Sequence, residues 1–543
     1  DFVPQGTDQI LALARRPARA FEFIELQIDA AVNFQNGDTL GFGGMRRDGG
    51  LNVDRVQRLL YIFGGHAEGR DLGESMGQRT RHRIGPTLLF IFASVTDGGI
   101  FLGDIEELQP DADGLQGVLD KLDYLQTLGI NTIYFNPVFY ARSLHKYDGN
   151  SFHHVDPYFG PNPAGDLALM AEETSDPATW HWTEADKLFL ELVRQAHERK
   201  IRVIIDGVFN HTGRDFFAFA DLREQQAASP YKDWYIIQSF DDLATPQSEF
   251  RYRGWWGVDT LPEFANAKQG DDLHPGPKQY VFDVTSRWMD PDGNGDSSDG
   301  IDGWRLDVAN EVPTGFWRDW HDHVRRINPD AYTVAEVWDD ARDFLADGRF
   351  TATMNYYGFS YPAKGFLVDD VLTPSEAALQ LTGRRTAYAD SMQKALLNMM
   401  DSHDTDRLAS MIVNAGRRPY EQPARFDYDV GVSPRFVADY DVRKPTNAER
   451  RIQRMVALLQ MCYVGAPMIY YGTEAGMWGG DDPCDRMPMV WPDMTYEPQQ
   501  ADPRGRPRPA DAVRQLAGPR AGRRLAEVGD QRQRAGLVDG DAG

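Results

Sequence analysis

Residues 183–206 read TEADKLFLELVRQAHERKIRVIID. The first part, Thr183 to Lys200, predicts a helix, and the short β-branched run from Ile201 to Asp206 predicts a buried strand that ends on a carboxylate. A helix that leads directly into a buried strand is the repeating unit of a parallel α/β sheet.

The same alternation recurs from about residue 114 to about residue 475. Because polar residues gather at the C-terminal ends of the predicted strands, a closed (β/α)8 TIM barrel is favoured over a doubly wound sheet. The further helices are expected at Gly114 to Gly129, Gly315 to Ile327 and Glu449 to Tyr463, and the further strands at Asn131 to Pro137, Ala331 to Glu336, Ala395 to Asp401 and Pro467 to Tyr471.

Composition and charge narrow the class of protein. The chain has 543 residues, of which 41% are apolar and 12% aromatic, enough for a large soluble core. Its 57 basic and 82 acidic residues give a net charge of −25, which argues against nucleic-acid or membrane partners and favours a neutral substrate. Cys462 and Cys484 provide no disulfide framework and no metal-ligand spacing. The sequence contains no run of eighteen apolar residues, so no membrane span is predicted. The compartment and the oligomeric state stay open.

Charged residues follow the predicted strands. Arg305 stands two residues before Asp307, so in an extended strand both side chains share a face, where the guanidinium would keep the carboxylate ionised as a nucleophile. Taken singly, each of these residues has a structural alternative, as an ion pair, a helix cap or a surface acid. Together they predict one site at the end of a barrel. The other members are Asp206, His211, Glu336, His403 and Asp404.

These segments resemble the α-amylase family of glycoside hydrolases (family 13). Four signature regions occur in order, at residues 206–211 (DGVFNH), 303–307 (GWRLD), 335–338 (AEVW) and 401–404 (DSHD). Residues 136–148 and 470–483 are similar to the family's second strand with its loop and to its eighth strand. Residues 255–262 (WWGVDTLP) resemble the form found in neopullulanase, cyclomaltodextrinase and amylopullulanase members.

The resemblance implies a retaining mechanism with two carboxylates. Asp307 matches the nucleophile, Glu336 the general acid and base, and Asp404 the third acid, which holds substrate hydroxyls. Glu336 lies among apolar neighbours and is expected to keep its proton near neutral pH. Substrate contacts are expected from Tyr147, Asp206, His211, Arg305, His403 and Trp256, and more weakly from Arg486. No catalytic cofactor is implied.

The implied substrate is an α-glucan: maltooligosaccharide, cyclodextrin, pullulan or starch. Sugar rings present apolar faces that stack on flat aromatic side chains, and the predicted loop after His211 is rich in them. The alternative is that these aromatics form the core of that loop. Three functions stay open: a hydrolase of α-1,4 bonds with or without α-1,6 activity, a transglycosylase, and an inactive or truncated carbohydrate-binding homologue.

The resemblance covers roughly residues 114–509, expected to be the catalytic barrel, with a small domain inserted after the third strand at about 212–275. Residues 1–113 form an atypical N-terminal region in which Phe21 to Ile28 is a candidate first strand; residues 39–98 contain only a short apolar run, Leu88 to Ala93. No aromatic residue follows Tyr496. The family's C-terminal β-sandwich is not recognisable, and residues 510–543 are expected to be a disordered or aberrant tail.

A structural calcium site is also expected. Oxygen-bearing side chains alternate with glycines between Asp290 and Asp299, much as in a calcium loop, although Ile301 stands where a bidentate glutamate is usual. The alternative is an acidic turn without an ion. The expected ligands are Asp290, Asp292, Asn294 and Asp296, and Asn210 matches a calcium ligand of many family members.

Overall fold

The computed structural model describes residues 90–93, residues 114–416 except 243, 246, 268–269 and 346–347, and residues 434, 437, 439–481, 484–487 and 489. Within these ranges, eight parallel strands form one sheet in the order β8-β7-β6-β3-β2-β1-β10-β9. Their bounds are β1 Phe90–Ala93, β2 Thr132–Phe135, β3 Arg202–Gly207, β6 Gly303–Leu306, β7 Tyr332–Ala335, β8 Ala352–Thr353, β9 Leu397–Asn398 and β10 Ala466–Tyr470.

The sheet closes into a barrel between its two end strands. Met354, directly after β8, forms a parallel bridge with Leu397 in β9, and the Asn355 amide donates to the Leu397 carbonyl at 2.8 Å. A closed sheet has no free edge, so its inward-facing side chains must fill a common interior. The (β/α)8 barrel expected from the sequence is therefore confirmed.

The first strand of the barrel is Phe90–Ala93. Phe92 pairs with Tyr134 of β2 on one side and with Tyr470 of β10 on the other. This short apolar run thus takes the position that the sequence suggested for Phe21 to Ile28, which lies outside the described residues.

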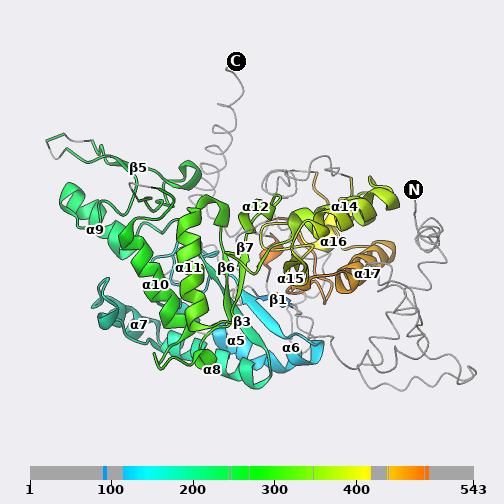
Figure 1. Cartoon of the computed structure of the whole chain (residues 1–543), viewed down its shortest axis with the longest axis horizontal. Coiled ribbons are helices and arrows are strands. Elements are labelled where there is room, and N and C mark those ends of the chain that lie inside the picture. Colours follow the sequence, from blue (N-terminus) through cyan, green and yellow to red (C-terminus); the bar gives the residue numbers. More distant parts are fainter. Residues whose placement is uncertain are drawn as a thin grey trace, which may run out of the picture.

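Helices surround the strands, with α10 and α11 on one side and α14 to α17 on another (Figure 1). Helix α8 begins with a capping box, in which the Thr183 and Asp186 side chains each accept from the other's backbone amide. Its buried face includes Phe189, Leu192 and Val193. The helices are α5 Gly114–Asp120, α6 Leu122–Leu128, α7 Pro163–Met170, α8 Glu184–Glu198, α9 Phe217–Gln225, α10 Pro275–Met289, α11 Thr314–Ile327, α12 Arg342–Leu345, α13 Tyr361–Ala363, α14 Pro374–Thr386, α15 Asp390–Gln393, α16 Leu408–Val413 and α17 Asn447–Cys462.

Two local expectations differ from the structure. The single helix expected over Gly114 to Gly129 is two helices, α5 and α6, separated at Lys121. The strand expected over Ala395 to Asp401 is reduced to two residues, because the backbone beyond Asn398 leaves the sheet.

Between β3 and α10 the chain leaves the barrel as a long excursion. It contains α9 and an antiparallel pair, β4 Ile237–Ser239 and β5 Arg251–Tyr252. In Figure 1, α9 and β5 project away from the strands of the barrel. This excursion coincides with the predicted insertion at about 212–275; its status as a separate domain stays a prediction. The predicted tail, residues 510–543, lies outside the described residues. The part of the chain where family members continue with a C-terminal sandwich also lies outside them.

Strand alternation decides which side chains enter the barrel. In β3, Ile204 packs in the inner cluster, whereas Val203 and Ile205 pack in the cluster that includes helical residues. In β6, Trp304 and Leu306 belong to the outer cluster, so Arg305 between them is directed inward. No helix in the described part of the chain combines the length and the apolar character needed to span a bilayer.

Candidate active site

Four charged side chains meet at the C-terminal ends of β3, β6 and β7. In the parallel register Asp206 pairs with Arg305, and Arg305 with Val334. Asp307 follows β6 directly, and Glu336 follows β7 directly. Because neighbouring parallel strands end at the same level, their last inward-facing residues lie together.

Arg305 is the centre of this group. Its Nη1 donates to Asp206 Oδ1 at 3.0 Å and Oδ2 at 2.9 Å, and to Asp307 Oδ1 at 2.9 Å. Its Nη2 lies 2.9 Å from Glu336 Oε2. Arg305 and Asp206 are fully buried, while Asp307 and Glu336 keep 6% and 5% exposure. One guanidinium therefore contacts three carboxylates, of which two reach the surface of the barrel mouth.

The electrostatics correct one expectation. Burial raises the pKa of Asp307 well above its ordinary value, opposed by Arg305 and reinforced by Glu336 and Asp206. Burial also raises the pKa of Asp206, again opposed by Arg305. The single charge of Arg305 is divided among three carboxylates, so it offsets only part of the effect of burial on the pKa of Asp307.

Glu336 is held by two donors that sequence reasoning did not single out. The Val308 amide donates to its Oε2 at 2.8 Å, and Trp338 Nε1 donates to its Oε1 at 3.0 Å. The Trp338 ring is itself stacked on Tyr356, with centroids 3.6 Å apart. Val308 has φ +38°, a strained conformation for a β-branched residue, and it follows Asp307 directly. Backbone strain beside Asp307 thus aims an amide at Glu336.

A second chain of contacts joins four more of the predicted residues, Tyr147, His403, Asp404 and Arg486. Tyr147 Oη donates to Asp206 Oδ2 at 3.0 Å, and its ring is stacked on His403 at 5.5 Å and 5°. His403 Nε2 lies 3.1 Å from Asp404 Oδ2. Arg486 Nη2 donates to the His403 carbonyl at 2.8 Å and lies 3.8 Å from Asp404 Oδ1. Asp404 is thereby connected to the Arg305 cluster through two rings.

Tyr134 in β2 was missed. Its hydroxyl donates to Asp206 Oδ2 at 2.9 Å, so Asp206 accepts from two tyrosines and one arginine. A tyrosine in the middle of a predicted buried strand was the available signal, because a buried hydroxyl needs a partner.

His211 and Trp256 lie on the side of the excursion. Burial lowers the pKa of His211 to about 3, so its ring is neutral at neutral pH. His211 stacks on Trp255 at 5.3 Å, and the Trp255 ring lies 5.3 Å from Trp256. Both indoles donate to Glu311, each at 3.0 Å. Trp256 remains 74% exposed.

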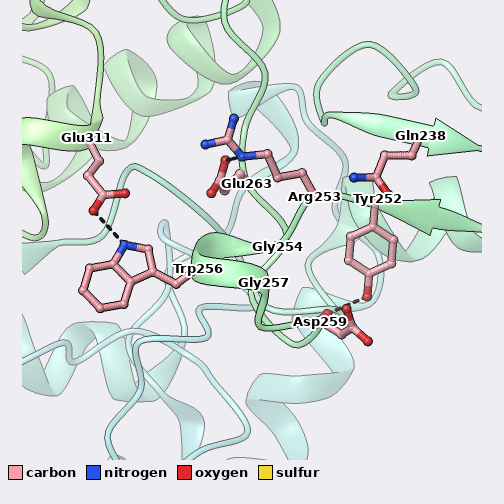
Figure 2. A pocket seen from close by; sticks show the side chains of 9 residues that line it. All are labelled: Gln238, Tyr252, Arg253, Gly254, Trp256, Gly257, Asp259, Glu263 and Glu311. Atoms are coloured by element: carbon pink, nitrogen blue, oxygen red, sulfur yellow. Dashed lines mark hydrogen bonds and ion pairs between the residues drawn. The ribbon is translucent and has the colours of Figure 1, made fainter. Parts of the chain in front are cut away.

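Trp256 lines a pocket formed largely by the excursion (Figure 2). Arg253 and Glu263 form an ion pair at 2.7 Å in its wall, and Tyr252 Oη donates to the Asp259 carbonyl at 2.5 Å. Among the predicted substrate contacts and catalytic residues, Trp256 alone lines this pocket. The contacts reported above join the others to Arg305, and His211 is connected to them by a hydrogen bond to the Tyr147 backbone.

The acidic loop after α10 brings together a different set from the one expected. Asp290, Asp292 and Asp299 have carboxylate oxygens within 4.8 Å of one another. The side chains of Asn294 and Asp296 accept from backbone amides inside the loop, at 2.6 and 3.1 Å. Asp299, which was not expected, is the third carboxylate of this group, and the roles of Asn294 and Asp296 as ligands stay predictions.

Asn210 is engaged elsewhere. Its side-chain nitrogen Nδ2 lies 3.2 Å from His211 Nδ1, and its backbone carbonyl accepts from the Phe264 backbone amide at 3.1 Å. Its expected role as a calcium ligand stays a prediction.

Comparison with known proteins agrees with this geometry. The chain matches the family described as alpha amylase, catalytic domain, over residues 92–176 and 181–424. The chain belongs to the α-amylase family. Neopullulanase 2 of Thermoactinomyces vulgaris is 34% identical over 377 residues, which are 69% of this chain and 52% of the relative. A cyclomaltodextrinase of Geobacillus thermopakistaniensis is 34% identical over 378 residues, with the same two coverages.

Two solved structures superpose on the chain. Cyclic alpha-maltosyl-(1→6)-maltose hydrolase from Arthrobacter globiformis, in complex with maltose, superposes with a TM-score of 0.57 at 25% identity, covering 80% of this chain and 83% of that one. The debranching enzyme of Nostoc punctiforme gives a TM-score of 0.54 at 29% identity, covering 73% and 74%. The chain spans about half the length of the curated relatives it matches.

Proposed function

We propose that this chain is a retaining α-glucan hydrolase that cleaves α-1,4 glucosidic bonds, with α-1,6 activity as a further possibility for the assay to test. The observation that carries the proposal is the position of Asp307 and Glu336 on two nitrogens of the same buried guanidinium, each at 2.9 Å. A retaining glycosidase needs two carboxyl groups on either side of one anomeric carbon, and a shared arginine fixes them around one point.

In the first step, a carboxylate oxygen of Asp307 attacks the anomeric carbon while the Glu336 carboxyl gives its proton to the departing glycosidic oxygen. The bond between sugar and leaving group breaks as the ester to Asp307 forms. In the second step, Glu336 removes a proton from water, and the hydroxide oxygen displaces Asp307 from the anomeric carbon. That Glu336 holds this proton before the first step stays a prediction.

The substrate ring would lie against Tyr147, which offers a flat face beside Asp206 and His403. Asp404 would accept from sugar hydroxyls, and neutral His211 can donate to them. Sugar recognition combines such stacking faces with fork-like polar groups. The relatives named neopullulanase and cyclomaltodextrinase support pullulan and cyclodextrin as substrates to test for this chain.

The proposal is tested by incubating the purified chain with maltoheptaose, β-cyclodextrin, pullulan and soluble starch and separating the products. Shorter products support hydrolysis, and products longer than the starting sugar indicate transfer to a second sugar. No product from any substrate, from a chain with a folded circular-dichroism spectrum, contradicts the proposal. Retention is checked by NMR of the first anomer released, which is α for a retaining enzyme.

We also propose a structural calcium ion at Asp290, Asp292 and Asp299. Asp290 Oδ1 and Asp299 Oδ1 are buried and lack a hydrogen-bond partner among the described residues, which suits oxygens that bind a hard cation. The ion would offset two of the three negative charges in this loop and would supply no step of the reaction. A lower unfolding temperature in EGTA, restored by calcium and absent in Asp292→Asn, is expected.

A further inference from the structure

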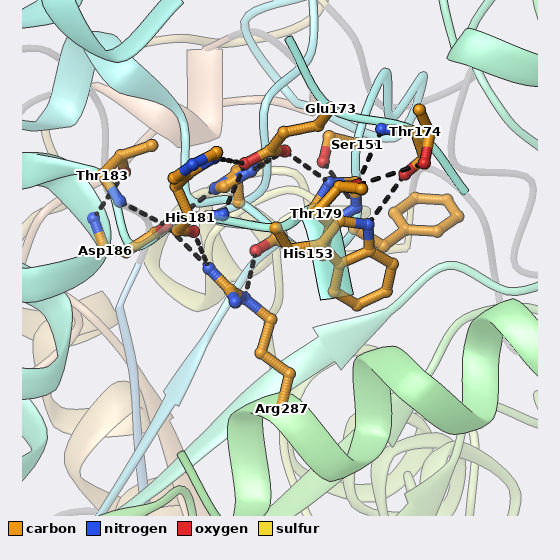
Figure 3. Close-up of polar contacts among 12 residues, drawn as sticks. Ser151, His153, Glu173, Thr174, Thr179, His181, Thr183, Asp186 and Arg287 are labelled. Atoms are coloured by element: carbon orange, nitrogen blue, oxygen red, sulfur yellow. Dashed lines mark hydrogen bonds and ion pairs between the residues drawn. The ribbon is translucent and has the colours of Figure 1, made fainter. Parts of the chain in front are cut away.

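A second buried polar cluster lies in the segment between β2 and α8, outside the Arg305 network. His153 Nε2 lies 3.1 Å from Glu173 Oε2 (Figure 3). His154 Nε2 lies 2.6 Å from the same oxygen. The two imidazole rings are buried, with centroids 4.5 Å apart. Two imidazole nitrogens and a carboxylate thus converge on one point.

The remaining ring nitrogens are occupied by other partners. His154 Nδ1 lies 2.7 Å from Asp186 Oδ2, and His153 Nδ1 lies 2.8 Å from Tyr280 Oη. Imidazoles that bind metal ions characteristically use one nitrogen for the ion and the other for a carboxylate, a carbonyl or another polar group. His154 with Asp186 has the carboxylate–histidine arrangement found at zinc sites.

We propose that His153, His154 and Glu173 form a site for a divalent transition-metal ion such as Zn²⁺. The three ligand atoms lie within 4.8 Å of one another. Tetrahedral zinc with bonds of about 2.0–2.1 Å separates its ligands by roughly 3.3 Å, so His154 must withdraw slightly from Glu173 to admit the ion. Two nitrogens and an oxygen suit Zn²⁺ rather than Ca²⁺.

His181 lies on the solvent side of the site but outside the convergent group. Its Nδ1 lies 3.2 Å from Glu173 Oε1, the oxygen that His153 and His154 do not contact, and half of its side chain is exposed. A water molecule would therefore take the fourth position on the ion.

The alternative occupant is a proton. Both neighbours of the His154 ring are carboxylates, which only accept, so without a metal ion both ring nitrogens carry hydrogen. The charged groups facing it are Glu173, Asp186 and Arg287, whose Nη2 lies 3.3 Å from Asp186 Oδ2. A metal ion would replace the Nε2 proton and would interact with both carboxylates.

An ion here would fasten the segment that presents Tyr147. Phe139 and Val155 form an antiparallel bridge at the base of this segment, adjoining His154, and Tyr147 lies between them in the chain. The other end of the site is Asp186, which also caps α8. The ion would therefore connect the base of the Tyr147 segment to a helix of the barrel, a structural role that does not depend on the proposed glycosidase activity.

The test uses tag-free chain freed of metal by a chelator and titrated with Zn²⁺ or Co²⁺. We expect one ion per chain after gel filtration, visible absorption bands of tetrahedral Co²⁺, and an unfolding temperature that rises with Zn²⁺. His153→Gln should weaken Zn²⁺ binding by about a hundredfold or more, because it removes a ligand outright.

His197→Gln is the matched control. His197 Nε2 also pairs with an aspartate, Asp302 Oδ2 at 2.8 Å, without a second imidazole, and its loss should leave Zn²⁺ binding unchanged. A wild-type chain that binds no stoichiometric Zn²⁺ at micromolar concentrations would establish the proton as the occupant. Equal binding by His153→Gln would also refute the site. Should His154→Gln fail to fold, the Co²⁺ spectra of wild type and His153→Gln decide.

Discussion

The Arg305 cluster and the His154 cluster solve the same electrostatic problem in two ways. Each gathers buried carboxylates around a cation: Asp206, Asp307 and Glu336 around Arg305, and Glu173 and Asp186 around His154. The guanidinium cannot lose its charge, whereas an imidazole can give up its proton.

This difference decides what each centre can bind. Around Arg305 one permanent cation faces three carboxylates, and burial raises the pKa of Asp206 and Asp307, an arrangement that suits acid–base chemistry on a neutral sugar. Around His154 the charge sits on nitrogens that are also metal ligands, so a metal ion can replace the proton. A permanent cation therefore favours catalysis by the carboxylates around it. A titratable imidazole favours exchange of its proton for a metal ion.

The largest effect is expected from removing the nucleophile. Asp307→Asn should lower kcat/KM on maltoheptaose by roughly 10⁴-fold or more, because no covalent intermediate can form. The fold should survive, since an amide still fits beside Arg305. The matched control is Asp319→Asn, which loses an exposed aspartate that also pairs with a cation, Lys278, and should keep full activity. Substantial activity in Asp307→Asn would show that another residue is the nucleophile.

The permanent cation can be removed directly. Arg305→Gln should destabilise the fold by about 3–5 kcal/mol at neutral pH, because it leaves buried carboxylates unpaired. The folded-state pKa values of Asp206 and Asp307, already raised, rise further, so the folded chain holds protons that the unfolded chain releases. The deficit relative to wild type should therefore shrink as the pH falls toward 4. Urea unfolding between pH 4 and 8 measures this, and a pH-independent deficit would contradict the shared-charge account.

Glu336 can be tested through its indole donor. Trp338→Phe keeps the ring against Tyr356 but removes the hydrogen bond to Glu336, and should lower kcat about tenfold, equivalent to about 1.4 kcal/mol. The loss should be smaller with a nitrophenyl maltoside, whose leaving group needs little protonation. An equal loss on both substrates would mean that Trp338 acts through packing instead of through the acid.

The smallest effect is expected at the exposed aromatic. Trp256→Ala should raise KM for maltoheptaose only a few-fold, because it removes one stacking face for a sugar ring. It should leave the unfolding temperature unchanged, because a ring this exposed contributes little to the fold. Leu379→Ala on α14 is the matched control, since Leu379 is also 74% exposed. If the two variants have the same KM, Trp256 is not a substrate contact.

The sequence predicted the barrel because its units are local. Helix α8 and strand β3 are recognisable within 24 residues, and their period-2 and helical patterns place Asp206 without reference to the rest of the chain. Strand β8 was not predicted, because Ala352–Thr353 is too short to show alternation. The first strand was sought at Phe21 to Ile28 because both runs are apolar and only pairing with β2 and β10 distinguishes Phe90–Ala93.

The site was predicted where residues act at strand ends and missed where they act by contact. The carboxylates occupy recognisable positions, and Arg305 shares a face with Asp307 by spacing alone. Trp338 and Val308 were not singled out, because their role depends on the hydrogen bonds they make to Glu336. The raised pKa of Asp307 was not predicted for a similar reason: the number of carboxylates around Arg305 is a property of three strands.

The place of β1 in the sheet has a consequence for how the chain folds. Strand β1 can pair with β10 only after Tyr470, the partner of Phe92, has been synthesised near the end of the described chain. Contacts this distant in sequence form slowly, because loop closure opposes them until the last strand arrives. During synthesis the β1 edge is an open template for other strands. Barrel closure at β10 is therefore the step at which aggregation competes with folding, and at which a chaperone would be of most use.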